Sequence, residues 1–379
     1  MEDNIIACLL GSALGDGFGW PTEFMQLEAI KKRWGNDGLT EPLGEIIRVT
    51  DDTQMALAVA RAFMIAWQNE AINPVRLEDE LIKEFITWLN DPENNRAPGM
   101  TCLRACTNLE KGQPWLEATV RSSKGCGANM RVIPVALMKY KRPGISDELV
   151  AQWAQFQAAI THANPTALAA TELTAVTVIR ILEGTSPDDL VSVLLDHCQT
   201  QQGRYHEDWL DSVWERPDIN TPQEFINLGW QECRAVLEKV QAAVKKGDKI
   251  TDPCLYTGDG WTAEEALATA LLCFLYFPDD SVATLRRAVN TRGDSDSIAC
   301  LAGGFAGARN GLASFPQDWL RRLEYQNELN QFLDFCCVEG SHLVRASSLN
   351  AVNFAESGTP ARAYLVSGNR AGRLTEPSV

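Results

Sequence analysis

Two short acidic segments, far apart in the chain, most strongly constrain how this protein folds. The sequence TDDT begins at Thr50, and the sequence DSDS begins at Asp294, about 240 residues later. Each segment combines carboxylates with hydroxyl groups, which are the hard oxygen ligands that Mg²⁺ prefers. We hypothesise that both segments bind metal at one site. A shared site requires that the segments meet in space, which favours one domain over two.

The acidic segments also have a purely structural interpretation. Each is followed at once by an apolar run of small residues that is predicted to be helical. Asp and Thr cap the first N–H groups of helices, where the helix dipole favours negative charge. A cap needs only one residue, so the consecutive Asp51 and Asp52 favour an additional ligand role. For the second segment the alternatives are a solvated turn or a calcium-like loop, but the later EF-hand ligands are missing.

Helical periodicity runs through most of the chain. In residues 53–68, Leu57, Ala60, Met64 and Trp67 recur with the spacing of one helix face. Comparable patterns predict helices over 79–90, 148–160, 166–183, 223–245, 263–277 and 281–289. Alternating runs of β-branched residues, which would indicate strands, are scarce. The sequence therefore predicts an all-α fold, a compact multi-helix domain, with breaks at 33–45, 91–99, 111–114, 122–128, 201–222 and 252–262.

Composition excludes several classes of function. The chain has 379 residues, 45% of them hydrophobic, which is enough for a large core. Its net charge of −16 argues against a nucleic-acid-binding protein and against attachment to anionic membranes. The net charge does not exclude a local basic pocket that binds phosphate. The 11 cysteines form no C-x-x-C pair, which favours reduced thiols. With no basic region before the first apolar run, the protein is predicted to be cytoplasmic.

The composition changes near residue 340. Beyond this point Ser, Asn, Ala, Gly and Arg predominate, and helical periodicity is weak. We therefore predict a domain over residues 1–340 and a C-terminal extension over residues 341–379. The extension is either a flexible tail or an arm that binds a partner.

Three further segments carry residues suited to catalysis or binding. Glu23 follows a proline turn, where it could face a cleft, although a single Glu is usually a surface charge. The loop SSKGCGANMR, from Ser122, has closely spaced glycines whose N–H groups can approach a phosphate, unless it is an ordinary turn. Cys126 in this loop has no neighbouring base that would activate it as a nucleophile. His162 lies at a helix junction, and a single His is more often structural than catalytic.

Together, and in this order, the segments resemble the ADP-ribosylglycohydrolase family. GSALGDGFGWPTEF resembles the family's N-terminal signature, TDDTQM its first metal motif and SSKGCGANMRVIP its glycine loop. THANP resembles its Thr-His motif, GWTAEEALATAL its late helix, and NTRGDSDSIACLAGGFAGARNG its second metal motif with the helix that follows. The resemblance extends from about residue 5 to about residue 312. Each motif alone is weakly specific, whereas the ordered set is highly specific.

This resemblance implies an orthogonal helical bundle around a central cleft that holds two Mg²⁺ ions, with Mn²⁺ as an alternative. The implied metal ligands are Thr50, Asp51, Asp52, Asp294, Asp296 and Ser297. The implied substrate-binding residues are Ser123, Gly125, Cys126, Gly127 and His162. The family usually has Thr in place of Ser297, so the hydroxyl ligand is kept. It frequently has Asn in place of Cys126, so the contact with ADP-ribose is expected to differ.

The implied reaction is hydrolysis of the bond between C1 of the distal ribose and an acceptor, with arginine on a protein as the favoured acceptor. Glu23, Asp52 and Asp296 are the implied catalytic residues. Glu23 is expected to act as a general base or to assist protonation of the leaving group. Serine, a nucleobase and an O-acetyl ester are alternative acceptors. The alternative functions are a binding or immunity protein that blocks or reverses an ADP-ribosyltransferase, and another two-metal hydrolase such as a phosphoesterase.

Overall fold

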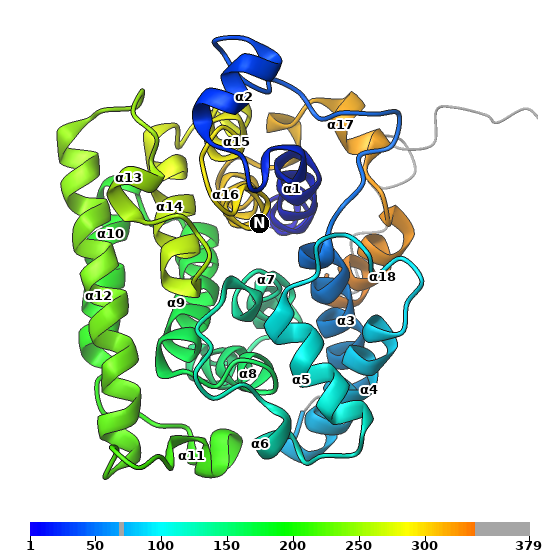
Figure 1. Ribbon diagram of the computed structural model, residues 1–379, viewed down its shortest axis with the longest axis vertical. Coiled ribbons are helices and arrows are strands. Elements are labelled where there is room, and N and C mark those ends of the chain that lie inside the picture. Colours follow the sequence, from blue (N-terminus) through cyan, green and yellow to red (C-terminus); the bar gives the residue numbers. More distant parts are fainter. Residues whose placement is uncertain (68–71, 338–379) are drawn as a thin grey trace, which may run out of the picture. The chain divides into compact units, whose positions relative to one another are not determined.

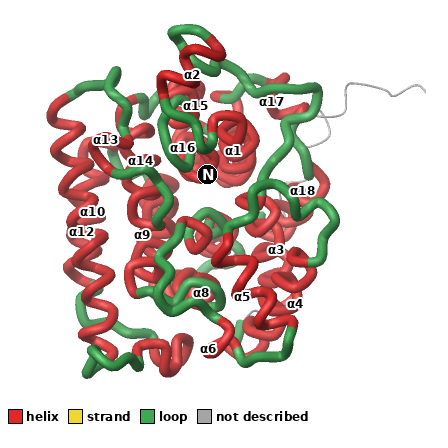
Figure 2. Tube along the Cα trace, viewed as in Figure 1, coloured by secondary structure: helices red, strands yellow, loops and turns green. Residues whose placement is uncertain are grey.

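The computed structural model describes residues 1–67 and 72–337. Within these residues the regular structure is entirely helical, and apart from isolated bridges no strand is present (Figure 2). The prediction of an all-α fold is therefore confirmed. The predicted extension over residues 341–379 lies outside the described residues, so the boundary at residue 340 stays a prediction.

The helices follow one another with connections of varied length, among them the long loop over residues 35–50 between α2 and α3 (Figure 1). The longer ones are α1 (Glu2–Gly19), α3 (Asp51–Ala66), α4 (Pro74–Leu89), α5 (Met100–Glu110), α8 (Asp147–Ala159), α9 (Pro165–Leu182), α10 (Pro187–Thr200), α12 (Pro222–Lys246), α14 (Ala263–Tyr276), α15 (Ser281–Val289), α16 (Ser295–Asn310) and α18 (Gln326–Cys336). The shorter ones are α2 (Leu27–Trp34), α6 (Trp115–Ala118), α7 (Ile133–Leu137), α11 (Glu207–Leu210), α13 (Cys254–Thr257) and α17 (Gln317–Arg322). Short 3₁₀-helices cover Trp20–Thr22, Cys126–Ala128, Met138–Tyr140, Asp211–Trp214 and Leu312–Ser314.

Each helix predicted from periodicity is present, and the differences lie at the ends. α4 begins at Pro74 rather than near residue 79, because Oδ1 of Asn73 accepts a hydrogen bond from the N–H of Arg76 at 2.9 Å. Proline suits the first turn of a helix, where its missing N–H has no partner to lose. The predicted breaks over 201–222 and 252–262 also contain α11 and α13. These helices are too short to show a periodic pattern in the sequence.

α1 and α16 lie side by side with their main chains in contact (Figure 1). A Cβ atom on Gly15 would overlap the carbonyl oxygen of Ala299. A Cβ atom on Gly11 would lie only 2.5 Å from the carbonyl oxygen of Gly303. Only glycine lets two helix backbones approach this closely, because any side chain would occupy the contact. The glycines of α1 therefore fix the distance and register of these two helices.

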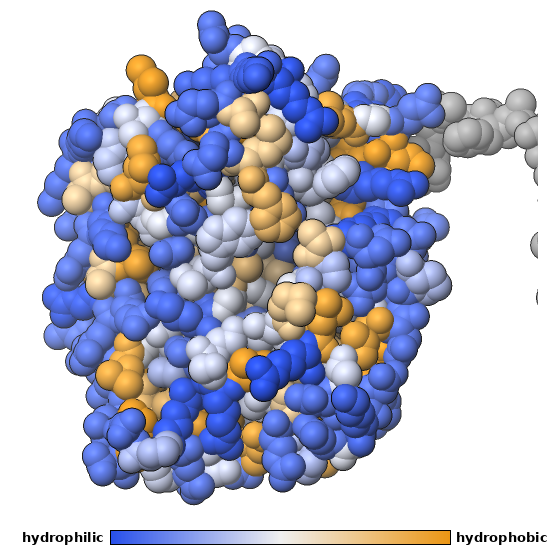
Figure 3. Space-filling view, in the orientation of Figure 1, coloured by the Kyte–Doolittle hydropathy of each residue, from blue (hydrophilic) through white to orange (hydrophobic). Residues whose placement is uncertain are grey.

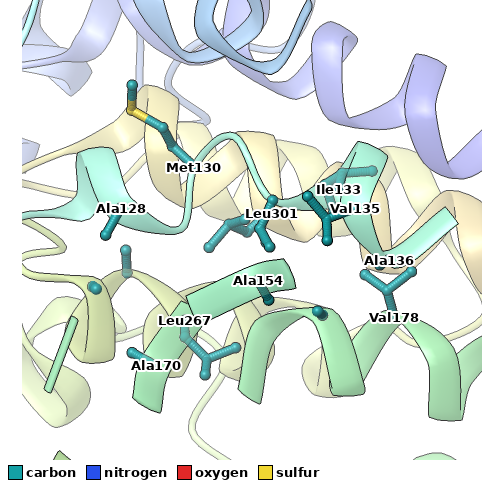
Figure 4. Packing of buried hydrophobic residues seen from close by; sticks show 14 of the residues in the cluster. Ala128, Met130, Ile133, Val135, Ala136, Ala154, Ala170, Val178, Leu267 and Leu301 are labelled. Carbon is teal, nitrogen blue, oxygen red and sulfur yellow. The ribbon is translucent and has the colours of Figure 1, made fainter. Parts of the chain in front are cut away.

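α9 lies at the centre of the hydrophobic core. The helix Pro165–Leu182 is long and apolar enough to cross a membrane by length and composition, yet 94% of it is buried inside the protein. Figure 4 shows Val178 of α9 in the same cluster as Ala154 of α8, Leu267 of α14 and Leu301 of α16. On the face drawn in Figure 3, by contrast, hydrophilic residues predominate. The apolar character of α9 is therefore that of a core helix.

The contact between α1 and α16 predicts different effects at two neighbouring glycines of α16. A Cβ on Gly303 would overlap the carbonyl oxygen of Gly11, whereas a Cβ on Gly304 would lie 3.0 Å from Cδ1 of Ile133, the movable end of a side chain. We expect Gly303→Ala to lower the free energy of unfolding by about 1–3 kcal/mol, as overpacking does. Gly304→Ala is the matched control and should cost less, because alanine gains about 1 kcal/mol in helix propensity. Equal losses in urea unfolding, followed by circular dichroism, would contradict the close packing.

Candidate functional site

The two acidic segments meet at the N-termini of α3 and α16. Asp51 and Asp52 are the first residues of α3, and Asp294 is the N-cap of α16. The hydroxyl of Ser297, in the first turn of α16, donates a hydrogen bond to Oδ1 of Asp52 at 3.3 Å. Segments that are about 240 residues apart in the sequence are therefore in direct contact.

The prediction that these segments cap helices is also correct for two of their residues. Thr50 caps α3, since its Oγ1 accepts a hydrogen bond from the N–H of Asp52 at 3.4 Å. Asp294 caps α16, since its Oδ1 accepts from the N–H of Ser297 at 3.4 Å. Asp52 has a different role, because its Oδ2 is buried and finds no hydrogen-bond partner among the described residues. An unpaired buried carboxylate oxygen is costly, and this one is available to a cation.

Asp16 on α1 holds the start of α3 in place, a role that the sequence did not reveal. Its side chain is fully buried. Its two carboxylate oxygens accept hydrogen bonds from the N–H and hydroxyl groups of both Thr50 and Thr53, at 2.5–3.0 Å. Burial and the charge of Asp296 raise the pKa of Asp16 to about 7. The available signal was a single charged residue inside an apolar segment of small residues.

A cavity of about 340 Å³ lies where these helix ends face the glycine loop. The predicted site residues that line it are Glu23, Asp51, Asp52, Gly125, Cys126, Gly127, His162, Asp294, Asp296 and Ser297. Two predicted residues lie behind the lining. The hydroxyl of Thr50 donates to Asp16 at 2.7 Å, and that of Ser123 is hydrogen-bonded to the hydroxyl of Thr101 at 2.9 Å.

Buried carboxylates crowd one wall of this cavity. One oxygen from each of Glu23, Asp294 and Asp296 lies within 4.8 Å of the other two, a spacing that suits a shared cation. Burial, followed by repulsion from Asp296, raises the pKa of Glu23 to about 10. Burial also raises the pKa of Asp51 to about 8 and that of Asp52 well above its usual value. A bound cation would relieve this repulsion, so the oxygen donors fit Mg²⁺ or Mn²⁺.

Cys126 contacts this acidic wall. Its Sγ donates a hydrogen bond to Oδ2 of Asp294 at 2.8 Å. Burial and the charge of Asp294 hold the pKa of the thiol well above its usual value. A buried, protonated thiol is a poor nucleophile, so the geometry suits a donor that orients Asp294.

The glycine loop is held against the segment that precedes α14. The N–H of Cys126 donates to the carbonyl of Trp261 at 3.1 Å, and the N–H of Ala263 donates to the carbonyl of Lys124 at 2.8 Å. The ammonium group of Lys124 is paired with two glutamates, at 2.6 and 2.5 Å. The charge of this lysine is therefore already compensated inside the protein.

Two aromatic residues that sequence reasoning missed also line the cavity. Phe24 and Trp261 stack with ring centroids 5.2 Å apart and an angle of 17° between their planes. Phe24 is 68% exposed and has a φ angle of 62°, which is rare for a residue with a bulky side chain. Its N–H donates to the carbonyl of Gly293, directly before the second acidic segment. Each aromatic residue lies in a different segment, and no local pattern signals that the two meet.

The fold, the facing carboxylates and the glycine loop define a helical protein with a candidate metal centre. A family model described as ADP-ribosylglycohydrolase matches residues 1–349, which is most of the chain. The chain therefore belongs to the ADP-ribosylglycohydrolase family, whose members are enzymes that hydrolyse glycosidic linkages of ADP-ribose. The family resemblance inferred from the motifs and the prediction of an enzyme are confirmed.

Individual relatives match along most of their length. Human ADP-ribosylhydrolase ARH3 is 25% identical, over 85% of this chain and 89% of its own. The ADP-ribosyl-dinitrogen reductase glycohydrolase of Rhodospirillum rubrum is 24% identical, over 86% of this chain and 92% of its own. The ADP-ribosylarginine hydrolase Tri1 of Serratia proteamaculans is 23% identical, over 88% of this chain and 78% of its own. A solved structure described as an ADP-ribosylglycohydrolase-related protein complex has a TM-score of 0.60 at 23% identity, covers 88% of this chain and 97% of that chain, and supports the fold.

The crowding of buried carboxylates predicts a specific response to divalent cations. Mg²⁺ at about 100 times its Kd should raise the free energy of unfolding by about 2.7 kcal/mol, which thermal unfolding with and without a chelator measures. Asp52→Asn should lose most of this gain. The metal-free variant should nevertheless be no less stable than the metal-free wild type, because it lacks one of the repelling charges.

Asp79→Asn on α4 is the control for this experiment, since the same change at an exposed position should leave the gain intact. A wild-type protein whose stability is the same with and without Mg²⁺ or Mn²⁺ would contradict the metal site.

Proposed function

We propose that this protein is a magnesium-dependent hydrolase that removes ADP-ribose from a modified acceptor by cleavage at C1 of the distal ribose. The observation that carries the proposal is the convergence of two acidic helix ends, the glycine loop and His162 on one cavity. Membership of the family supplies the class of substrate. The favoured substrate is ADP-ribosyl-arginine on a protein.

The oxygen atoms around the two helix ends are the candidate metal ligands. They belong to Thr50, Asp51, Asp52, Asp294, Asp296 and Ser297. When bound, two divalent ions at such a site neutralise the carboxylates, orient substrate hydroxyls and lower the pKa of water. The unpaired Oδ2 of Asp52 supports a cation at this wall. Thr50 fits the set because Asp16 accepts its hydroxyl proton, which leaves an oxygen lone pair for a ligand.

Glu23 is the candidate general acid–base. Its carboxyl lies beside those of Asp294 and Asp296, and its pKa of about 10 lets it hold a proton at neutral pH. Cleavage of a glycosidic bond passes through an oxocarbenium-like transition state. In the protonated form that the metal-free site favours, Glu23 would give a proton to the leaving group. To take a proton from the attacking water it would have to be a carboxylate, which bound cations would favour by offsetting the charges of Asp294 and Asp296. Asp52 and Asp296, the other two candidate catalytic residues, would act by holding the divalent ions that orient the ribose and the attacking water.

The glycine loop is the candidate binding site for the diphosphate. Gly125, Cys126 and Gly127 line the cavity beside the carboxylates, where Sγ of Cys126 donates to Oδ2 of Asp294. The N–H groups of Gly125 and Cys126 already donate to Oγ of Ser123 and to the carbonyl of Trp261. The N–H of Gly127 is therefore the candidate donor to an anion, which an acidic wall alone would repel. Ser123 would support the loop from behind through its hydrogen bond to Thr101.

The lining beside Glu23 favours an arginine acceptor. A guanidinium is planar and always charged, and it stacks well on aromatic faces. The stacked Phe24 and Trp261 offer such a face next to the carboxylate of Glu23. Serine, nucleobase and O-acetyl linkages remain the alternative acceptors. A second role as a protein that blocks an ADP-ribosyltransferase would draw on residues 341–379, which lie outside the described residues.

A panel of differently linked ADP-ribosyl substrates tests this function. The purified protein should release free ADP-ribose from ADP-ribosyl-arginine faster than from serine, nucleobase or O-acetyl conjugates, and only with Mg²⁺ or Mn²⁺ present. Chromatography of the products identifies the broken bond. Release of AMP or phosphate instead would identify a phosphoesterase, and release from serine alone would overturn the arginine assignment.

Glu23→Gln tests the assigned acid–base. Loss of the titrating group should reduce turnover by a factor of about 10²–10⁴, with a much smaller change in the affinity for ADP-ribose. Steady-state kinetics and calorimetry measure the two effects separately. Glu28→Gln, the same change at an exposed position on α2, should change neither. Unchanged turnover in Glu23→Gln would remove its catalytic assignment.

A further inference from the structure

Arg131 is a fully buried cation without a carboxylate partner in the described part of the chain. Its Nε donates to Oε1 of Gln157 at 2.7 Å, and its Nη2 donates to the Gln157 carbonyl at 2.9 Å and to Oγ1 of Thr161 at 2.7 Å. Its Nη1 faces the sulfur atoms of Met55 and Cys102, at 3.4 and 3.7 Å. All these partners are neutral. Burial of a charge without an ion pair is expensive, and the ring of Phe85, 4.5 Å from the guanidinium, and the negative charge of Asp51 offset part of this cost.

The hydrogen bond from Arg131 fixes the direction of the Thr161 hydroxyl. A guanidinium can only donate, so Oγ1 of Thr161 accepts from it. The hydroxyl proton of Thr161 then has two acceptors within reach, Nδ1 of His162 at 2.8 Å and the carbonyl of Ala158 at 3.4 Å.

The carbonyl of Ala158 is already occupied. It accepts hydrogen bonds from the N–H of His162 at 2.8 Å and from the N–H of Thr161 at 3.1 Å. A carbonyl oxygen has two lone pairs, and both are used here. The Thr161 hydroxyl therefore donates to Nδ1 of His162, which is both nearer and unoccupied.

This donation determines which ring nitrogen of His162 carries the proton. The ring is buried, and burial together with the charge of Arg131 holds the pKa of His162 well below its usual value. In a neutral ring whose Nδ1 accepts, the proton is on Nε2. Nε2 lies at the glycine loop, where a Cβ atom on Gly125 or Gly127 would be 3.3 Å away from it. His162 also lines the cavity, and Nε2 is its ring nitrogen beside the glycine loop.

We propose that Arg131 and Thr161 are positioning residues that lock His162 as the Nε2–H tautomer, so that Nε2 donates to an oxygen atom of the ligand held at Gly125 and Gly127. The identity of that ligand as ADP-ribose, through a diphosphate or ribose oxygen, rests on the proposed function. The tautomer itself does not. In this arrangement His162 is a fixed hydrogen-bond donor and takes no part in proton transfer.

Nitrogen NMR of the histidine rings tests the lock in ligand-free, metal-free protein. The chain has 4 histidines, and the spectrum of His162→Gln identifies the signals of His162 by their loss. Long-range proton–nitrogen correlations of the wild type should show a protonated Nε2 and an unprotonated Nδ1. A wild-type spectrum with the proton on Nδ1 of His162 would overturn the proposal.

Thr161→Val tests the relay by removing the hydroxyl while keeping the shape of the side chain. The tautomer of His162 should become mixed, and Thr161→Ser should restore it. Thr177→Val is the matched control, because the hydroxyl of that buried threonine bonds only to the carbonyl of Leu173 in its own helix. A locked Nε2–H tautomer in Thr161→Val would overturn the relay.

The affinity for ADP-ribose tests the consequence of the lock. Calorimetry should show binding about tenfold weaker in Thr161→Val, with wild-type affinity in Thr161→Ser and Thr177→Val. In turnover the loss should appear in KM, with kcat and the pH profile unchanged. Equal affinity in Thr161→Val and wild type would overturn the donor role of Nε2. If the wild type bound no ADP-ribose, the proposed function would fail, whereas the NMR result would still decide the tautomer.

Discussion

The contact between the backbones of α1 and α16 is the constraint on which the site depends. Gly11 and Gly15 remove the side chains that would hold the helices apart, so the register of α16 along α1 is fixed by main-chain contact. Gly19, at the end of α1, lies against the backbone of Asp296. In the same helix, Asp16 binds the start of α3 through Thr50 and Thr53. One helix therefore positions both acidic segments.

The site brings together buried carboxylates, an arrangement that suits the binding of a ligand and lowers the stability of the ligand-free fold. The carboxylates of Asp51, Asp52, Asp294 and Asp296 are buried together, and each has a raised pKa. Such a group destabilises the fold unless a ligand neutralises it. Arg131, which contacts Met55 of α3 and Cys102 of α5, has neutral hydrogen-bonding partners and donates to Thr161, which is hydrogen-bonded to His162. The cavity lining therefore combines carboxylates, whose oxygens suit a cation, with His162, whose Nε2–H we propose as a donor to a ligand oxygen.

The sequence predicted many of the helices and about half of the residues that line the cavity. Long helices such as α9 and α12 have periodic patterns that burial of one face imposes locally, whereas α1, α5, α10 and α18 were not predicted. The acidic segments were recognised because neighbouring carboxylates are unusual at a helix start that needs only one cap. Asp16, Phe24 and Trp261 were missed, because each is an isolated residue whose partners lie in other segments. The tautomer of His162 was equally out of reach, since it depends on Arg131 and on the occupied carbonyl of Ala158.

By itself, the sequence determined that the chain is helical, which residues can supply hard oxygen ligands, and to which family the ordered motifs belong. Helix formation and ligand chemistry depend on residues that are close together in the sequence, and the family is recognised from the order of several such short segments. The tertiary structure decided that Ser297 touches Asp52, that Asp16 holds Thr50, and that the glycine loop faces the carboxylates. Those contacts join residues distant in the chain, and only the close packing of whole helices brings them within hydrogen-bonding distance.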